Sequence, residues 1–288
     1  MIMLNIVIFI SRKESTDMPT STQQTLVHTD ISGAVAHIRL TRARKRNALN
    51  DAIMQALQAA FVALPDRVRA VVLDGEGEHF CAGLDLSQVL DHSATDGFLQ
   101  SRSWHRIFFD HIKFGKVPVI SVLHGAVVGG GLELACATHL RVAEESAFYA
   151  LPEGQRGIFV GGSGTVTISE IIGLARMTDM ILTGRVLTAT EGQQIGLSQY
   201  LVANGRGLDT AMELAERIAS NAPMSNYAVM HALPRIAEMP MDHGLLLEGL
   251  MAGVTQSEQQ AKWRVRGFLE SGEGKVRPNR PHPAAAAK

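Results

Sequence analysis

The alternation of apolar and polar residues predicts a strand and a helix at the start of the folded chain. Residues 34–40 alternate apolar with polar side chains, which is the period of a half-buried strand. Asn50 then stands at a helix-capping position, and apolar residues recur on one helical face from there until Pro65. The basic run 42–46 separates the two as a turn, so the chain opens with a strand, a loop and a helix.

Further apolar segments predict strands, and one of them leads into a glycine triplet. Residues 68–74 form the second predicted strand, which ends at a glycine turn. The nearly continuous apolar run 117–123 is typical of a strand buried on both faces, and the triplet and a helix over 132–138 follow it. Short strands are predicted over 139–143 and 147–151. This alternation indicates an α/β fold with right-handed crossovers.

The remaining segments give weaker patterns. Residues 79–100 lack a clean period, so we expect a loop with a short helix there. From Ser163 onward the pattern is mainly helical, with predicted breaks at Gly184, Gly205 and Pro223.

The chain divides into three predicted parts. Residues 1–24 are expected to be a disordered N-terminal extension, residues 25–222 the folded core, and residues 223–288 a helical C-terminal region with a tail. The apolar run 1–10 is shorter than the roughly 20 residues that span a bilayer, and it lacks the flanks of a secretory signal. Met18 is an alternative start, so residues 1–17 need not belong to the working protein.

Composition and charge exclude several classes of protein. The 288 residues are 46% hydrophobic and carry 27 Lys plus Arg against 28 Asp plus Glu. This apolar content supports a packed core rather than disorder, and the balanced charge argues against a nucleic-acid partner bound through phosphates. Cys81 and Cys136 are too few for a disulfide framework, which favours a reducing, cytoplasmic location.

Searches for cofactor and nucleophile motifs fail. The chain has no HExxH, no Cys/His cluster with metal-ligand spacing, no phosphate-binding P-loop and no GxGxxG after a predicted strand. The segment 161–164 resembles a nucleophile elbow, but Thr165 stands where that motif needs glycine.

Two glycine-containing loops that follow predicted strands are the first candidates for a site. They are residues 79–86 and 129–133. Glycine lets the backbone approach a ligand closely, and a helix that opens after the triplet directs its free N–H groups toward that ligand. Two such loops can supply converging N–H donors to one oxygen, which is the arrangement of an oxyanion hole.

Glu133 and Glu153 are the second candidates. Glu133 lies at the start of the predicted helix, and Glu153 follows the strand that returns from it. Two carboxylates brought together in this way can hold a water molecule, one accepting a proton while the other donates one, which fits a lyase or an isomerase. Each residue alone is open to a structural interpretation, because a glutamate in a first helical turn commonly complements the helix dipole.

Five segments together resemble the crotonase (enoyl-CoA hydratase/isomerase) superfamily. They share the order and spacing of that family over about residues 26–270. The matching segments are 46–50, 80–86, 118–133, 151–153, and 182–184 with 189–196.

The resemblance implies a spiral of ββα units with a helical C-terminal trimerisation region, assembled as a homotrimer or a dimer of trimers. It also implies an acyl-CoA substrate whose thioester oxygen accepts from the backbone N–H groups of Leu84 and Gly130. Glu133 and Glu153 match the two glutamates that activate water and manage the α-proton. No metal or redox cofactor is implied, coenzyme A enters as part of the substrate, and neither a nucleic-acid nor a membrane partner is expected.

The same resemblance suggests residues that bind the substrate. Residues 85–104 are expected to wall the acyl chain, and basic residues are expected near the coenzyme A phosphates. The candidates for contact with substrate or coenzyme A are Lys45, Arg46, Ala82, Asp85 and Phe159.

The presence of both acids favours an enoyl-CoA hydratase of degradative fatty-acid metabolism. Glu153 is expected to exchange the proton on the substrate carbon, and Glu133 to deprotonate water. An isomerase that uses only the acid matching Glu153 is an alternative, as are an acyl-CoA hydrolase or lyase on the same fold. A dienoyl isomerase is less favoured because Gly161 stands where it would need Asp. A non-catalytic acyl-CoA-binding protein is the alternative from another class.

Overall fold

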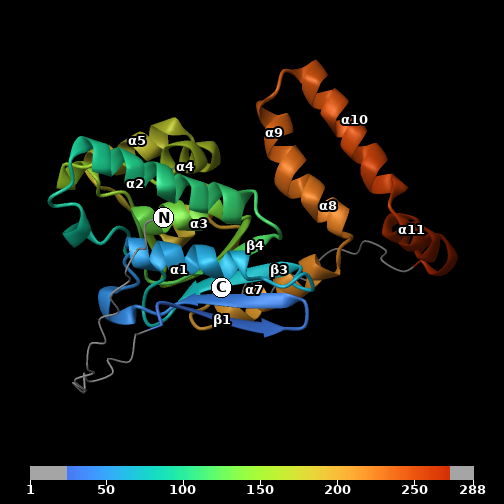
Figure 1. The fold of residues 1–288 in the computed structure, drawn as a ribbon, viewed down its shortest axis with the longest axis horizontal. Coiled ribbons are helices and arrows are strands. Elements are labelled where there is room, and N and C mark those ends of the chain that lie inside the picture. The colour runs from blue at the N-terminus through green and yellow to red at the C-terminus, as the bar shows by residue number, and fades with distance from the viewer. Residues whose placement is uncertain (1–24, 273–288) are drawn as a thin grey trace, which may run out of the picture.

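The computed structural model describes residues 25–272, which form an α/β core and an arm of helices at the C-terminal side (Figure 1). The predicted extension 1–24 and the tail 281–288 lie outside the described residues. In the described range, no helix is long and apolar enough to cross a membrane.

The core contains two sheets. The larger has the strand order β1-β2-β3-β4-β6-β9, in which β1 runs antiparallel to β2 and all other neighbours are parallel. The smaller has the order β5-β7-β8. The bounds are β1 (Val27–Ser32), β2 (Val35–Leu40), β3 (Ala70–Gly75), β4 (Val119–Leu123), β5 (Ala126–Val128), β6 (Leu140–Glu144), β7 (Phe148–Ala150), β8 (Val186–Thr188) and β9 (Tyr200–Val202).

Strand β3 shows why the larger sheet is covered on both faces. All six of its residues are buried, and alternate side chains point to opposite faces of the sheet. Val71 and Leu73 join the cluster that includes residues of helices α1 (Asp51–Val62) and α3 (Gly130–Ala137). Ala70 and Val72 join a second cluster with helix α7 (Gly207–Ser220). The predicted strands over 34–40, 68–74 and 117–123 are therefore confirmed, as is the predicted capping of α1 by Asn50.

The segment 79–100 differs from its prediction. Helix α2 (Ala94–Arg106) is longer than the short helix expected there, and a π-helix, η3 (Ile107–Lys113), continues it. Ser93 and Asp96 form a capping box that starts α2. Of its thirteen residues only Trp104 is buried, so the apolar period that would have predicted this helix is missing.

The predicted helix breaks at Gly184 and Gly205 are confirmed, but the chain around them is not all helical. Gly184 ends helix α5 (Leu174–Thr183) with a φ of 69°, and Gly205 lies just before α7 with a φ of 78°. Strands β8 and β9 were not predicted; each has only three residues, too few to show a period. The two helices that complete this part of the core are α4 (Gly164–Ile172) and α6 (Ala189–Gln194).

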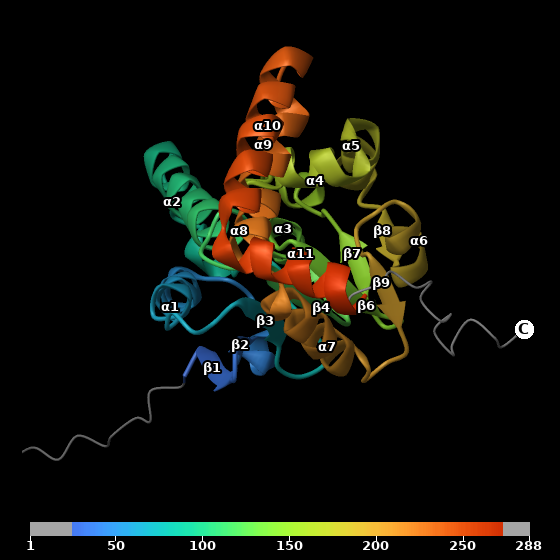
Figure 2. The same cartoon turned by 90° about the vertical axis from the view of Figure 1, so that its right-hand side faces the viewer.

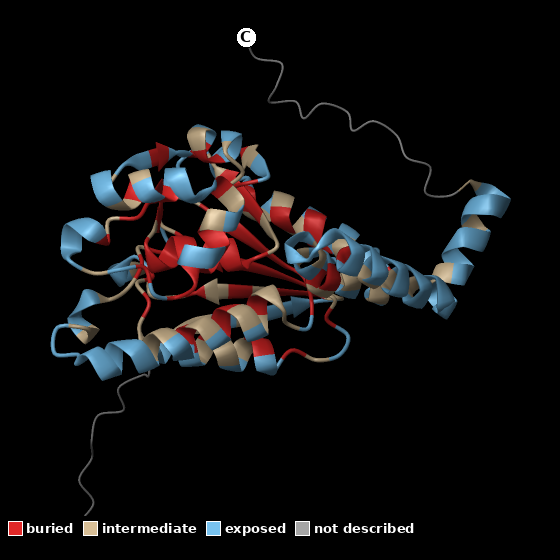
Figure 3. Cartoon of the chain, turned by 90° about the horizontal axis from the view of Figure 1, so that it is seen from above, coloured by how far each residue is buried: buried red, intermediate tan, exposed pale blue. Residues whose placement is uncertain are grey.

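The C-terminal arm stands to the right of the core in Figure 1, and in Figure 2, which is seen from that side, it lies in front of the core. It consists of α8 (Pro223–Tyr227), the π-helix η5 (Ala228–Ala232), α9 (Leu233–Glu238), α10 (Met241–Ser257) and α11 (Gln259–Ser271). Pro223 occupies the first position of α8, as the predicted break requires. Figure 3 shows that most of the arm is exposed, in contrast to the central strands of the core such as β3 and β4, whose residues are all buried.

Candidate active site

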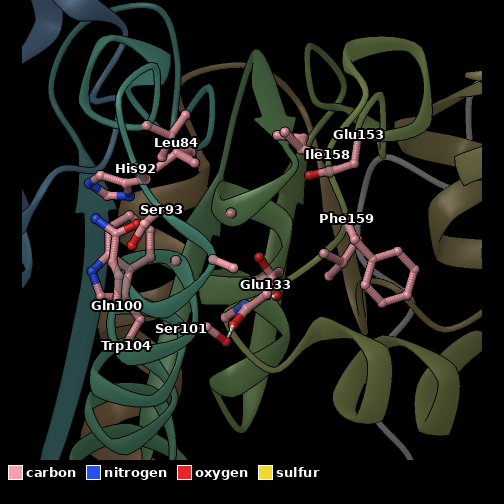
Figure 4. Close-up of a pocket in the computed structure, with 17 residues that line it drawn as sticks. Leu84, His92, Ser93, Gln100, Ser101, Trp104, Glu133, Glu153, Ile158 and Phe159 are labelled. Carbon is pink, nitrogen blue, oxygen red and sulfur yellow. Dashed lines mark hydrogen bonds between the residues drawn. The ribbon is translucent and has the colours of Figure 1, made fainter.

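A pocket of about 320 Å³ lies between α2, α3 and the loop 158–162 (Figure 4). It brings together the four residues that the sequence nominated for catalysis, which are Leu84, Gly130, Glu133 and Glu153. In Figure 4, Glu133 and Glu153 lie across the pocket from His92, Gln100 and Trp104. The rest of the lining is Val89, Ser93, Ala94, Gly97, Ser101, Ile158, Phe159, Val160, Gly161 and Gly162.

The glycine triplet allows α3 to begin against the neighbouring loops. Gly129 has a φ of 54°, and a Cβ there would lie 2.5 Å from Oε1 of Glu153. A Cβ at Gly131 would lie 2.3 Å from the carbonyl oxygen of Cys81. Any larger residue at these two positions would therefore displace either a candidate catalytic group or the backbone beside it.

The amides of Leu84 and Gly130 are the two candidate donors. The loop around Leu84 is fixed by a hydrogen bond from Leu49 N to Gly83 O (2.7 Å) and by one from Asp85 N to Leu49 O (2.8 Å). A Cβ on Gly130 would lie 3.5 Å from Leu84 N, so the two amides belong to closely packed backbones. Among the described residues, neither amide donates to a protein acceptor, which leaves both for a ligand oxygen.

Glu133 is held by the backbone at the start of α4. Its side chain projects from α3, and Oε1 accepts hydrogen bonds from Gly162 N and Gly164 N, each at 2.7 Å. The residue is only 4% exposed. Burial raises the pKa of Glu133 to about 7, the two amides oppose that shift, and the charge of Glu153 adds to it.

Glu153 follows β7 and lies directly before the short helix η4 (Gly154–Arg156). It is 7% exposed, and its Oε2 has no hydrogen-bond partner in the part of the chain that the structure describes. Burial raises the pKa of Glu153, and the charge of Arg156 opposes that rise. A buried carboxyl oxygen without a partner is unfavourable, so this atom is a natural contact for a ligand or for water.

The predicted substrate contacts are mostly placed elsewhere. Only Phe159 lines the pocket, and this residue is 72% exposed. Lys45 and Arg46 are exposed on the preceding loop, and the Ala82 amide donates to the Arg46 carbonyl. Asp85 accepts from Ser87 Oγ (2.7 Å) and from Arg42 Nη1 (2.8 Å), and both interactions lower its pKa. Asp85 therefore holds the Leu84 loop in place in this structure and does not line the pocket.

Two supports of the site were missed by sequence reasoning. Asn47 is fully buried, and its Nδ2 donates to the carbonyl oxygens of Glu76 and His79, which ties two loops together. The segment 161–164 was rejected as a nucleophile elbow, and the structure shows that its amides hold Glu133. A glycine-rich run before a helix was the available signal, but its acceptor lies 29 residues away from Gly162.

A metal centre finds no support in the part of the molecule described. Within residues 25–272, no group of three or more His, Cys, Asp or Glu side chains is placed to hold a metal ion. Cys81 and Cys136 are both buried and free.

Comparison with known proteins gives the family. The enoyl-CoA hydratase/isomerase family model matches residues 30–277. The chain belongs to this family. The resemblance inferred from the sequence is thus confirmed, and the family implies an acyl-CoA substrate.

Individual relatives match this chain over most of its length. The chain is 33% identical to the (E)-benzylidenesuccinyl-CoA hydratase of Thauera aromatica, over 84% of this chain and 94% of that one. It is 29% identical to the short-chain-enoyl-CoA hydratase of Clostridium acetobutylicum, over 83% and 92% of the two chains.

Solved structures confirm the predicted fold class. One solved structure is of a Rhodopseudomonas palustris protein that has been named an enoyl-CoA hydratase provisionally. It is 56% identical to this chain, with a TM-score of 0.84 over 88% of this chain and 97% of that one. The enoyl-CoA hydratase of Bacillus anthracis is 28% identical, with a TM-score of 0.80 over 85% and 96%. The α/β crotonase fold, with two sheets and C-terminal helices, is therefore confirmed.

Proposed function

We propose that this protein is an enoyl-CoA hydratase, which adds water across the 2,3 double bond of a 2-enoyl-CoA and gives a 3-hydroxyacyl-CoA. The observation that carries the proposal is the meeting of two buried carboxyl groups, Glu133 and Glu153, in the pocket that also contains the amides of Leu84 and Gly130. Hydration needs one group to take a proton from water and another to give a proton to carbon, so it uses both acids.

The proposed reaction begins with the thioester oxygen between the two amides. Glu133 takes a proton from water while the water oxygen bonds to C3. The electron pair of the double bond moves toward C2 and the thioester oxygen, and the resulting enolate is stabilised by the N–H groups of Leu84 and Gly130. Glu153 then gives its proton to C2. Transfer of the proton from Glu133 to Glu153 restores both groups.

The hydrogen bonds of the two acids support this division of roles. The two amides that donate to Glu133 favour the charged form that a base requires, and they oppose burial, which raises its pKa to about 7; a pKa near neutral lets this group both take up and release a proton. Glu153 has an unpartnered oxygen in the described structure, and its burial favours the protonated form that an acid requires. Because the charge of Glu153 also acts on Glu133, the two groups titrate as a pair.

The test is an assay with crotonyl-CoA that follows both the absorbance of the conjugated double bond and the mass of the product. A hydratase removes the absorbance and gives a product heavier by one water. An unchanged mass with a moved double bond would instead identify an isomerase, and release of free coenzyme A would identify a hydrolase. Binding without any chemical change would favour the non-catalytic alternative.

We also propose that the C-terminal arm joins subunits into a homotrimer or a dimer of trimers. Large apolar side chains on α10 support this, since Met241, Leu246 and Leu250 are between 60% and 78% exposed. Sedimentation of the full chain should give a trimer or hexamer, and a monomer at micromolar concentration would contradict the proposal. The cytoplasmic location stays a prediction.

A further inference from the structure

The wall of the pocket formed by α2 is lined by small side chains. Ala94, Gly97 and Ser101 line the pocket, and their spacing of three and four residues places them on one face of α2; the N-cap residue Ser93 lines the pocket beside them. Apart from the two chain neighbours of Gly97 and the nearby backbone of α2, no heavy atom of the described chain lies within 4 Å of a Cβ built on Gly97. Glycine is unfavourable inside a helix, and no neighbour requires it here, so its effect is to leave the pocket open beside α2.

The indole of Trp104 closes the end of this open face. Trp104 is 6% exposed, and its Nε1 donates to Oδ1 of Asp51 at 3.2 Å. Gln100 Nε2 donates to the same oxygen at 3.1 Å. Asp51 is the first residue of α1, so two side chains of α2 are tethered to the neighbouring helix.

A second pocket lies directly behind this barrier. It has a volume of about 520 Å³, and Trp104, Gln100 and His92 line it as well as the first pocket. Its other lining residues include the polar side chains of Asp51 and Gln55. Trp104 and Gln100 therefore separate the pocket that holds the two glutamates from a second, more polar space.

We propose that Trp104 is the end stop of the acyl-binding part of the pocket and thereby sets which substrates the protein accepts. The class is apolar, straight 2-enoyl groups that end at the indole, with longer chains excluded from the second pocket. The unpartnered Oε2 of Glu153, which is more than nine-tenths buried, independently marks the first pocket as a ligand site. This inference rests on the proposed function, since it takes an acyl-CoA as the ligand.

The experiment measures kcat/KM for hydration along a series of straight 2-enoyl-CoA thioesters from crotonyl to dodecenoyl. The dissociation constants of the matching saturated acyl-CoAs are measured by calorimetry. Wild type is compared with Trp104→Leu, which keeps an apolar side chain in the core, and with Gly97→Val, which adds bulk on the same face of α2, two turns before Trp104. Thr95→Val is the matched control, because Thr95 is on α2 but lines neither pocket.

For wild type, we expect kcat/KM to rise about fourfold per methylene, which corresponds to about 0.8 kcal/mol per buried CH₂, and then to fall once the chain reaches the indole. Trp104→Leu should move this break to longer chains and Gly97→Val to shorter chains, while Thr95→Val leaves it in place. A break that does not move in folded Trp104→Leu overturns the inference; if that variant does not fold, an unmoved break in Gly97→Val does so.

The binding series separates this inference from the proposed reaction. If no thioester is hydrated but the saturated acyl-CoAs show the break and its displacement, the hydratase proposal fails and the end stop stands. If hydration proceeds without a break that moves, the end stop fails and the hydratase proposal stands. If no acyl-CoA binds to wild type, both are overturned.

Discussion

The two helices that face each other across the pocket are built in opposite ways. All eight residues of α3 are buried, and this helix provides Glu133 and the amide of Gly130. Of the thirteen residues of α2, only Trp104 is buried, and the helix forms one wall of the pocket. The contrast indicates that the proposed catalytic groups of α3 lie where they cannot move without disturbing the core, whereas the proposed acyl-binding wall on α2 has few packing constraints.

This difference follows from what each wall has to do. Stabilisation of a developing charge depends on donors fixed in advance, so the proposed oxyanion amides and the proposed base need dense packing around them. The wall for an apolar acyl group needs only the right shape, because burial of apolar surface is not directional. Substitutions in the two helices should therefore have different consequences.

The largest expected effect comes from removal of either acid. Glu133→Gln and Glu153→Gln should each lower kcat for crotonyl-CoA hydration by about 10²- to 10⁴-fold, because each variant loses one of the two proton transfers. The measurement is steady-state kinetics, with circular dichroism to show that the fold is retained. Full activity in either variant would contradict the assigned roles.

The second prediction concerns the effect of buried Glu133, on α3, on the free energy of unfolding. The pKa of Glu133 is about 7 in the folded protein, above its ordinary value of 4.5, so the folded state binds a proton more tightly than the unfolded state. Wild type therefore loses stability as the pH rises from 4.5 to 7, by about 3 kcal/mol at 1.36 kcal/mol per pKa unit. Glu133→Gln does not titrate and still offers an oxygen to the two amides.

Urea unfolding of wild type and Glu133→Gln at several pH values checks this sign. The variant should be the more stable protein above pH 7, and its advantage should shrink toward pH 4.5. A variant that is less stable than wild type at alkaline pH would show that the charged form of Glu133 is well accommodated.

The third prediction tests the packing around α3. Gly131→Ala should destabilise the protein by about 2 kcal/mol, since its Cβ would lie 2.3 Å from the Cys81 carbonyl oxygen and the backbone would have to shift. Thermal unfolding measures the loss, and hydration kinetics should show a decrease in kcat because the start of α3 moves. Unchanged stability would mean that the two loops are less tightly packed than the structure indicates.

The smallest expected effect is the same substitution in α2, with the opposite sign. Gly97→Ala should stabilise the protein by about 0.5–1 kcal/mol, because alanine is the better helix former and its methyl group meets no neighbour within 4 Å in the described chain. Thermal unfolding beside Gly131→Ala makes the comparison direct. A loss of stability in Gly97→Ala would show that α2 is packed as closely as α3.

The same contrast explains which parts could be predicted from the sequence. The elements around α3 were predicted because 117–123 is a continuous apolar run and a glycine triplet follows it. Helix α2 was reduced to a loop with a short helix, because a helix with one buried residue has no apolar period to detect. The position of Asp85 was similarly beyond reach, since its ion pair with Arg42 is a property of the assembled chain.

Patterns along the chain were enough to identify the family, the main strands and the four groups expected to carry the chemistry. These depend on local features, namely apolar periods, glycines at tight turns and carboxylates at fixed positions along the chain. Two other features became visible only in the folded chain: the amides of Gly162 and Gly164 hold Glu133, and Trp104 is hydrogen-bonded to Asp51. Such contacts join residues far apart in the chain, and their geometry is set by the packing of whole helices and loops, which no local pattern records.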